Sequence, residues 1–309
     1  MANMERHLGI DIGGTNIACG IVNENGEIVA RSKVKTNSPR PYAEILADII
    51  RAAELACAEA GITPQQLASI GIGCPGTCNQ ATGVVEYSNN LGFVNAPLRT
   101  DIESKFGVPT YLGNDADAAA YGEYCAGAAK GAGSAVVITL GTGVGSGIII
   151  DGKIYSGSNF AGGEIGHTVI EVDGRPCTCG RNGCFEAYSS ATGLVNTTRE
   201  YAEKFPDSLM AELIKNEGKV SARTAYIAMK QGDEAGKIVT DLYVKYLAVG
   251  ITNVINICNE GDTLLVPLKK AVAEQVYSKR SAKNTEIVIC SLGNDAGIIG
   301  AAMLHRSCK

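Results

Sequence analysis

The chain has 309 residues, of which 45% are hydrophobic and 19% are charged, and its formal net charge is −5. This length suits two globular domains, and the lack of a long basic run argues against nucleic acid or an anionic membrane as the main partner. The sequence shows neither a signal peptide nor a bilayer-spanning stretch, so we expect a cytoplasmic protein whose 11 cysteines are thiols or metal ligands.

The first part of the chain predicts strands around a helix. Apolar runs at His7–Ile12 and Ile17–Val22 flank the segment Gly13-Gly14-Thr15, and Asn25-Gly26 is a hairpin turn signal. The further elements expected here are a strand at Glu27–Lys35, an Ala-rich helix at Tyr42–Ala60, a buried strand at Ser69–Cys74 that ends at Pro75-Gly76, and a strand at Val108–Leu112.

The second part of the chain begins with a helix near Asn114 and contains another glycine-rich hairpin. Strands at Ser134–Leu140 and Gly147–Ile150 flank its glycine loop, and Asp151-Gly152 marks the next hairpin turn. The remaining elements expected are a mostly helical segment at Cys184–Cys258, a helix at Thr263–Tyr277, a last strand at Glu286–Cys290 and a last helix at Ala296–His305.

Two motifs occur twice and in the same order. The hairpin segment Asp11–Thr15 parallels Thr139–Gly143, and Gly113–Ala116, which opens a helix, parallels Gly293–Ala296, which opens another. Chance recurrence of glycine-rich turns is the simpler alternative, but the order and the turn positions repeat together. We therefore expect two similar α/β domains that face one another.

Both glycine loops are suited to phosphate. In Gly13-Gly14-Thr15 and in Gly141-Thr142-Gly143, backbone N–H groups can point at an anion without obstruction by side chains. Either loop alone would be interpreted as an ordinary tight hairpin, but the pair suits a triphosphate, and Asp11 beside the first loop would orient Mg²⁺ through water. The chain contains no G-x-x-x-x-G-K-[ST] motif, and the second loop does not match G-x-G-x-x-G, so neither a P-loop nor a dinucleotide site is expected.

One imidazole and three thiols form a candidate zinc site. Cys177, Cys179 and Cys184 have the spacing C-x-C-x₄-C in a glycine-rich loop, and His167 precedes them. These four ligands complete the tetrahedral shell of a structural zinc, with no position open for catalysis. Three free thiols in a loop are the alternative.

These motifs are similar to those of sugar kinases of the ROK family, which groups repressors, open reading frames and kinases. The resemblance implies an α/β protein with the duplicated actin-like (ribonuclease H-like) ATPase fold and two domains around a cleft. It implies a smaller N-terminal domain at 1–113, a larger domain with the zinc loop at 114–295, and a C-terminal helix at 296–309 that packs on the first. The matching segments are DIGGTN (11–16), GCPG (73–76), NNLG (89–92), GNDA (113–116), LGTGVGSG (140–147), GGEIGH (162–167), CTCGRNGCFE (177–186) and LGNDAGIIGAA (292–302).

The resemblance implies an ATP-dependent hexose kinase of carbohydrate metabolism that phosphorylates glucose at the 6-hydroxyl in glycolysis, with ATP, catalytic Mg²⁺ and structural Zn²⁺, as a homodimer or homotetramer. Asp115 alone would most often be a helix N-cap, but the matching aspartate of the family is the catalytic base. The residues implied to line the sugar pocket are Gly76, Asn90, Asn114, Asp115, Glu164, His167 and Glu186. The residues implied to bind the nucleotide are Asp11, Gly13, Gly14, Thr15, Gly141, Thr142 and Gly143.

The family resemblance leaves three other functions to consider: a kinase for another sugar, a sugar-responsive repressor and a sugar-binding sensor. A kinase for N-acetylmannosamine or another hexose would use much the same residues. A sugar-responsive repressor would need a helix-turn-helix in front, for which the strand at His7 leaves no room. A catalytically impaired sugar-binding sensor is disfavoured because Asp115 is retained.

The sequence departs from the family pattern after Cys258. The family has a strand, a Gly-Gly-Gly turn that contacts adenosine and then a helix, roughly a dozen residues or more that are missing between Glu260 and Gly261. Either the sequence omits residues that the natural protein has here, or the protein lacks the loop, which would weaken ATP binding and favour a sensor. We prefer the first explanation because both flanks match the family, and it predicts Cα atoms of Glu260 and Gly261 much farther apart than the usual ~3.8 Å. A smaller departure is Asn16, where many relatives carry a lysine.

Overall fold

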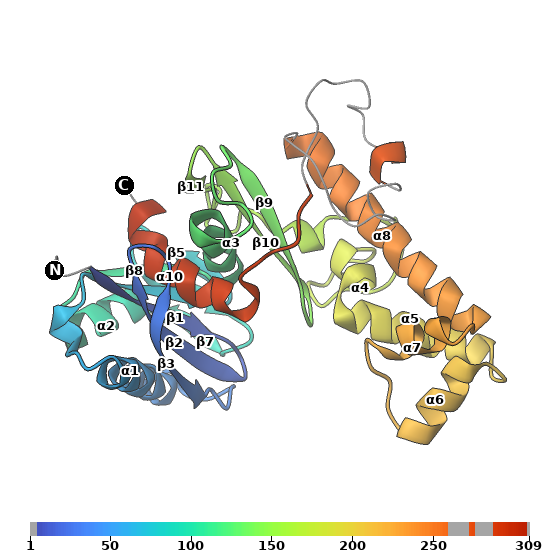
Figure 1. The fold of residues 1–309 in the computed structure, drawn as a ribbon, viewed down its shortest axis with the longest axis horizontal. Helices are drawn as coiled ribbons and strands as arrows, with labels where there is room; N and C mark the ends of the chain where they lie inside the picture. Colours follow the sequence, from blue (N-terminus) through green and yellow to red (C-terminus); the bar gives the residue numbers. More distant parts are fainter. Residues whose placement is uncertain (1–4, 259–271, 276–286, 308–309) are drawn as a thin grey trace. The chain divides into compact units, whose positions relative to one another are not determined.

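The computed structural model describes residues 5–258, 272–275 and 287–307 (Figure 1). Contacts within the chain group its residues into two compact units. The first unit consists of Met1–Val137, Ser146–Gly163 and Cys290–Lys309, and the second consists of Ile138–Gly145 and Glu164–Ile289. The chain therefore passes between the units several times.

The first unit is built on a mixed five-stranded sheet (Figure 1). Its strands, in order across the sheet, are β3 (Ile28–Lys35), β2 (Asn16–Asn23), β1 (Arg6–Ile12), β4 (Ser69–Cys74) and β8 (Thr110–Asn114). Neighbours among β1, β2 and β3 run antiparallel, whereas the pairs β1-β4 and β4-β8 run parallel. The carboxyl ends of β1, β4 and β8 therefore meet at one edge of the sheet.

One face of this sheet is covered by α1 (Tyr42–Glu59). Successive residues of a strand point to opposite faces, and on β1 the buried Leu8 and Ile10 share an apolar core with Ile45 and Ile49 of the helix. The helix has apolar residues at helical spacing, so it buries one side against the strands.

The other face of the sheet is covered by α10 (Ala296–Ser307), which also packs against α3 (Asp115–Ala126). Two paired glycines of β1 and β4 allow this contact. A Cβ on Gly9 would lie 1.9 Å from the carbonyl oxygen of Ile298, and a Cβ on Gly71 would lie 1.7 Å from that of Ala301. The backbone of α10 therefore lies directly on the strands, and no other residue type fits at these two positions.

The first unit contains short elements that the sequence did not predict. They lie mainly between residues 77 and 106, where strands of three to five residues offer too little periodicity to detect. They are the sheet β5 (Thr77–Asn79), β6 (Val84–Ser88), β7 (Phe93–Ala96) and the helix α2 (Leu98–Phe106). A third sheet has the order β11 (Lys153–Ile154), β10 (Val144–Ile150), β9 (Ala135–Leu140), and the hairpin between β9 and β10 belongs to the second unit.

The second unit is mostly helical, which confirms the expectation for Cys184–Cys258. Its apolar core includes Leu194, Met210 and Val239, all buried. The helices are α4 (Phe185–Ser189), α5 (Ala191–Lys204), α6 (Leu209–Glu217), α7 (Thr224–Lys230) and α8 (Glu234–Cys258), and a short 3₁₀ turn, η2, spans Ile165–His167.

One helix meets the length and hydropathy expected of a membrane span. This is Glu234–Ile255 within α8, and 50% of its most apolar window is buried inside the protein. Because α8 packs against α4, α5 and α7, it has the contacts of a core helix, which passes the same test. The finding is weak evidence for a membrane, and the sequence analysis identified no bilayer-spanning stretch.

Several predicted elements can be compared with the structure. The strand expected at Glu286–Cys290 is wrong for the described residues 287–290, which form no strand, and Ile289 is exposed. A four-residue apolar run is too short to specify a strand by itself. Of the helix expected at Thr263–Tyr277, only 272–275 is described, and it is helical. The junction between Glu260 and Gly261 lies outside the described residues. The expected domain boundary between residues 113 and 114 stays a prediction. The helix α3, which follows that boundary, belongs to the first unit by its contacts.

Candidate functional site

Two aspartates lie close together at the edge of the first unit's sheet. Asp11 is at the end of β1, and its register partner Gly73 on β4 pairs in turn with Gly113 on β8. Asp115 begins α3 directly after β8. A Cβ on Gly73 would lie 3.5 Å from the Cα atom of Asp115, so this glycine makes room for the start of the helix.

Asn114, and not Asp115, is the N-cap of α3. The Oδ1 atom of Asn114 accepts hydrogen bonds from the backbone N–H groups of Ala116 at 2.8 Å and Asp117 at 3.2 Å. Its Nδ2 atom donates to the carbonyl oxygen of Gly76 at 3.1 Å. Asn114 therefore fixes the helix start and the Gly76 loop together, so the carboxylate of Asp115 is not required as the cap.

Burial and charge change the acidity of Asp11. Burial, followed by the negative charge of Asp115, raises the pKa of Asp11 to about 6. Its carboxylate also lies against the start of α10, because a Cβ on Gly297 would lie 2.8 Å from Oδ2 of Asp11. The partial positive charge of a helix N-terminus favours an anion there. A divalent cation would favour the ionised form of Asp11 further.

The first glycine loop has two backbone donors to offer. The N–H group of Gly13 donates to the carbonyl oxygen of Asn16 at 2.8 Å and closes the turn. The N–H groups of Gly14 and Thr15 have no acceptor within the described part of the chain. Asn90 lies beside this loop, since its Cβ atom is 4.0 Å from a Cβ built on Gly14. The N–H groups of Gly14 and Thr15 are therefore the backbone donors of this loop that can bind an anion.

The neighbouring asparagines Asn89 and Asn90 differ in their contacts, and Asn90 stays the predicted ligand. The Oδ1 atom of Asn89 accepts a hydrogen bond from the Tyr87 hydroxyl at 3.2 Å. Asn89 is therefore engaged by the small sheet, whereas Asn90 lies near the first glycine loop.

The second glycine loop, in the second unit, has the same pattern. The N–H group of Gly141 donates to the carbonyl oxygen of Gly143 at 3.0 Å, and those of Thr142 and Gly143 have no acceptor among the described residues. Two loop carbonyls are held by the start of α5, where the Ala191 N–H donates to Gly141 at 2.9 Å and the Thr192 hydroxyl donates to Thr142 at 2.7 Å. Each loop thus presents two adjacent N–H groups.

The repeated Asn-Asp motif differs between its two copies. Asp295, the counterpart of Asp115, lies in a 3₁₀ turn before α10 and forms a two-pronged ion pair with Arg31 of β3. These hydrogen bonds lower the pKa of Asp295. A carboxylate that a guanidinium already neutralises is a poor proton acceptor, so only the first copy is suited to base catalysis. Sequence analysis missed Arg31, because its partner is 264 residues away.

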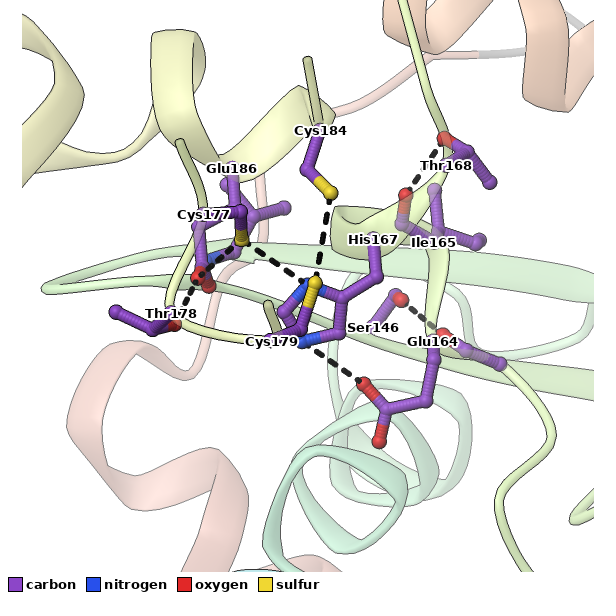
Figure 2. A network of polar contacts seen from close by, with 12 residues as sticks. Ser146, Glu164, Ile165, His167, Thr168, Cys177, Thr178, Cys179, Cys184 and Glu186 are labelled. Atoms are coloured by element: carbon purple, nitrogen blue, oxygen red, sulfur yellow. Dashed lines mark hydrogen bonds and ion pairs between the residues drawn. The ribbon is translucent and has the colours of Figure 1, made fainter. Parts of the chain in front are cut away.

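The four predicted zinc ligands lie together in the second unit (Figure 2). One ligand atom from each of His167, Cys177, Cys179 and Cys184 lies within 4.8 Å of the others. The Nδ1 atom of His167 is 3.6 Å from Sγ of Cys177, and Sγ of Cys179 is 3.6 Å from Sγ of Cys184. A tetrahedral zinc with Zn–S bonds of about 2.3 Å needs sulfur–sulfur separations of about 3.8 Å. The residue set therefore fits zinc.

Two of the three candidate thiol ligands have pKa values shifted in opposite directions. Burial, with the neighbouring thiols, raises the pKa of Cys184 to about 12, whereas the backbone N–H of Arg181 lowers the pKa of Cys179. Three thiolates side by side need a positive charge. The Nε2 atom of His167 is 4.0 Å from the carboxylate of Glu164, which is too far for a direct hydrogen bond.

Backbone hydrogen bonds and one arginine hold the loop that carries the cysteines. A backbone hydrogen bond of 2.8 Å joins the Cys177 N–H to the Arg181 carbonyl, and another of 2.8 Å joins Gly183 to Arg175. Arg175, which sequence analysis missed, pins the base of the loop: its guanidinium lies over the Tyr188 ring and donates to Glu200 at 2.6 Å. No local motif marks Arg175, since its partners are on α4 and α5.

Glu186 contacts both this loop and the second glycine loop, and Figure 2 shows it beside Cys177 and Thr178. It lies in the first turn of α4, and its Oε2 atom accepts a hydrogen bond from the Val144 N–H at 2.8 Å. The predicted site residues thus form two sets. Those of the first unit are Asp11, Gly13, Gly14, Thr15, Gly76, Asn90, Asn114 and Asp115, and those of the second are Gly141, Thr142, Gly143, Glu164, His167, Cys177, Cys179, Cys184 and Glu186.

Comparison with known proteins identifies the family. The model of the ROK family matches residues 7–307. The chain belongs to the ROK family. It is 36% identical to a glucokinase from Halalkalibacterium halodurans, over 97% of this chain and 94% of that one. It is also 28% identical to the xylose repressor of Bacillus subtilis, over 96% of this chain and 76% of the repressor.

A solved ROK structure supports the fold. The chain superimposes on a ROK family glucokinase from Streptomyces griseus, in complex with glucose and AMPPNP, with a TM-score of 0.78, 30% identity, and coverage of 97% of this chain and 98% of that one. The duplicated actin-like ATPase fold, which the resemblance to the ROK family implied, is therefore confirmed, as is the resemblance to ROK glucokinases.

The alignment with one relative contains positions that have no counterpart in this chain. Coverage of 97% of 309 residues is about 300 residues, whereas the alignment with the H. halodurans glucokinase runs over 313 positions. About a dozen positions of the alignment therefore have no residue in this chain. The segment expected between Glu260 and Gly261 stays a prediction.

Proposed function

We propose that this ROK protein is an ATP-dependent hexose kinase that transfers the γ-phosphoryl group of ATP to the 6-hydroxyl of glucose. The observation that carries this proposal is the arrangement at the sheet edge of the first unit. There, Asp115 stands at a helix start whose cap is supplied by Asn114, and a second half-buried carboxylate, that of Asp11, lies beside it. The likeness to ROK glucokinases supports glucose as the acceptor.

In the proposed reaction Asp115 is the general base. It accepts the proton of the 6-hydroxyl as the oxygen attacks the γ-phosphorus, and the bond from that phosphorus to the bridging oxygen of ADP breaks. Asp11 would hold Mg²⁺ through water, and Mg²⁺ when bound neutralises phosphate charge. The open N–H groups of Gly14, Thr15 and their counterparts Thr142 and Gly143 are the proposed phosphate donors.

The proposed sugar ligands present the donors and acceptors that a ring of hydroxyls needs. Carboxylates bind hydroxyl groups more strongly than neutral acceptors do, and a missing hydroxyl leaves a buried partner unsatisfied. The proposed set is Gly76, Asn90, Asn114, Asp115, Glu164, His167 and Glu186.

We propose that zinc, held by His167, Cys177, Cys179 and Cys184, has a structural role. The ion would cross-link η2 to the cysteine loop and so keep His167 in place, while Glu186 follows two residues after Cys184. With four protein ligands no coordination position stays open for substrate. We further propose a cytoplasmic homo-oligomer, a dimer or tetramer, that acts in glycolysis and does not bind nucleic acid.

The decisive experiment incubates the purified protein with ATP, Mg²⁺ and a panel of sugars: glucose, mannose, fructose, N-acetylmannosamine and N-acetylglucosamine. We expect equal amounts of ADP and hexose 6-phosphate, with the largest kcat/KM for glucose. The control is Asp115→Asn, which should bind glucose without turnover.

Two alternatives make different predictions in the same experiment. A kinase for N-acetylmannosamine would show its largest kcat/KM with that sugar. A sugar-binding sensor would bind glucose in calorimetry without producing ADP, and the segment missing near Glu260 is the observation that favours it. Absence of ADP production with every sugar would overturn the kinase proposal.

A further inference from the structure

The carboxylate of Glu186 joins two loops of the second unit (Figure 2). Its Oε2 atom accepts from the Val144 N–H at 2.8 Å, at the end of the second glycine loop. Its Oε1 atom is 3.4 Å from the Thr178 hydroxyl and 3.9 Å from Sγ of Cys177, both in the cysteine loop. A residue expected to contact sugar is therefore bonded to the loop expected to contact phosphate.

The Glu186 carboxylate approaches Gly143 so closely that no side chain fits there without displacing it. The three atoms nearest to a Cβ built on Gly143 all belong to Glu186, and the closest, Oε2, would be 2.3 Å away. Gly143 has an ordinary backbone conformation that other residues can adopt. The reason for a glycine at this position is thus the close approach of Glu186, and an alanine would push the carboxylate off Val144.

The contact determines which donors the loop can offer. The N–H group of Gly141 closes the turn and that of Val144 binds Glu186, which leaves the N–H groups of Thr142 and Gly143 without an acceptor in the described residues. On the other side the loop is held by Ala191 and Thr192 of α5. Glu186 is therefore the attachment that fixes the loop at its Val144 end.

We propose that Glu186 is a positioning residue for the phosphoryl donor, in addition to its expected contact with sugar. By holding Val144, it orients the N–H groups of Thr142 and Gly143 toward phosphate. This inference rests on the proposed kinase function. It predicts that nucleotide affinity depends on Glu186 even when no sugar is present, which a residue that contacts only sugar would not cause.

The first test measures AMPPNP binding with Mg²⁺ and without sugar, by calorimetry. Glu186→Ala should weaken binding about tenfold, because a hydrogen bond to a charged group is lost from the loop. Glu186→Gln keeps an acceptor oxygen for Val144 and should stay within about threefold of the unchanged protein. Glu164→Ala, which removes an expected sugar ligand that has no contact with the loop, is the matched control and should bind AMPPNP normally. Zinc content, measured by mass spectrometry, should be unchanged in all three variants.

The second test uses the steric relation between Gly143 and Glu186. Gly143→Ala alone should weaken sugar-free AMPPNP binding about as much as Glu186→Ala does, since it displaces the same carboxylate. In the Glu186→Ala background the added methyl group meets no other atom, so Gly143→Ala should have little further effect. This non-additivity is the signature of direct coupling between the two residues.

The outcomes separate this inference from the proposed function. If the unchanged protein binds AMPPNP but Glu186→Ala binds it equally well, the inference is wrong and the kinase proposal stands. If the unchanged protein shows neither nucleotide binding nor phosphoryl transfer, the kinase proposal itself fails. Additive effects of Gly143→Ala and Glu186→Ala would also contradict the inference.

Discussion

In the first unit the two candidate carboxylates stand at the ends of regular secondary structure, whereas in the second unit the candidate zinc ligands stand on short turns and a loop. Asp11 is the second-last residue of a strand, and Asp115 opens a helix whose N-cap is Asn114. His167 and the cysteines, by contrast, belong to short turns that Arg175 and a few backbone hydrogen bonds hold in shape.

This difference predicts that substitutions in the two units have different effects. Residues at strand and helix ends are positioned by the backbone ladder and by close contacts such as that of α10 on the sheet, so a single substitution changes chemistry without moving neighbours. Residues on loops depend on cross-links, and the loss of one cross-link moves several of them at once. The predictions below test this contrast.

The largest effect is expected in the first unit. Asp115→Asn should lower kcat about 10²- to 10⁴-fold, because an amide cannot accept the proton, while glucose affinity and zinc content stay close to normal. Single-turnover kinetics and calorimetry would measure the two quantities. Turnover near that of the unchanged protein would show that Asp115 is not the base, and a loss of zinc would contradict the separation of the two regions.

In the second unit a ligand substitution should affect binding broadly. Cys179→Ser should lose zinc and weaken glucose affinity at least about tenfold, because His167 and Glu186 are on the segments that zinc would join. Metal analysis of reduced protein and glucose calorimetry test this. Absence of zinc from the freshly purified, unchanged protein, or normal glucose affinity in the zinc-free variant, would overturn it.

The raised pKa of Asp11 predicts an acid limit on nucleotide use. Its pKa of about 6 means that Asp11 is a carboxylate above pH 6 and becomes neutral as the pH falls through that value. Since only the charged form would hold Mg²⁺, kcat/KM for ATP should fall about tenfold per pH unit below pH 6, with saturating sugar. Asp11→Asn should abolish this dependence along with most activity. A profile flat down to pH 5 would exclude Asp11 as the group.

The smallest effect is expected for Asp295, the repeat partner of Asp115. Asp295→Asn breaks an ion pair with Arg31 whose side chains are 53% and 37% exposed, and such surface pairs contribute about 0–1 kcal/mol to stability. We expect kcat to change less than about twofold and Tm to fall by a few degrees at most. Arg31→Gln should behave alike, and a large loss of kcat in either variant would mean that the two copies of the motif are not functionally distinct.

Sequence reasoning identified most of the fold because its signals are local. The glycine hairpins, the strands β1, β2, β3, β4 and β9, and the helices α1 and α10 follow from periodicity and turn residues. The zinc candidates came from the spacing of three cysteines. It missed β5, β6, β7 and α2, which are short, and it placed a strand at Glu286–Cys290, where the described residues 287–290 form none.

The sequence by itself thus determined the repeated motifs, the family, the cysteine and histidine set and the identity of the candidate base. Only the tertiary structure showed that Asn114 caps α3, that Arg31 neutralises Asp295, that Arg175 anchors the cysteine loop, and that Glu186 holds Val144 against Gly143. Most of these contacts join residues tens to hundreds of positions apart, and the periodicity of hydrophobic residues along the sequence does not reveal such pairs. The physical reason is that hydrogen bonds and close contacts depend on distance in space, which the order of residues along the chain does not specify.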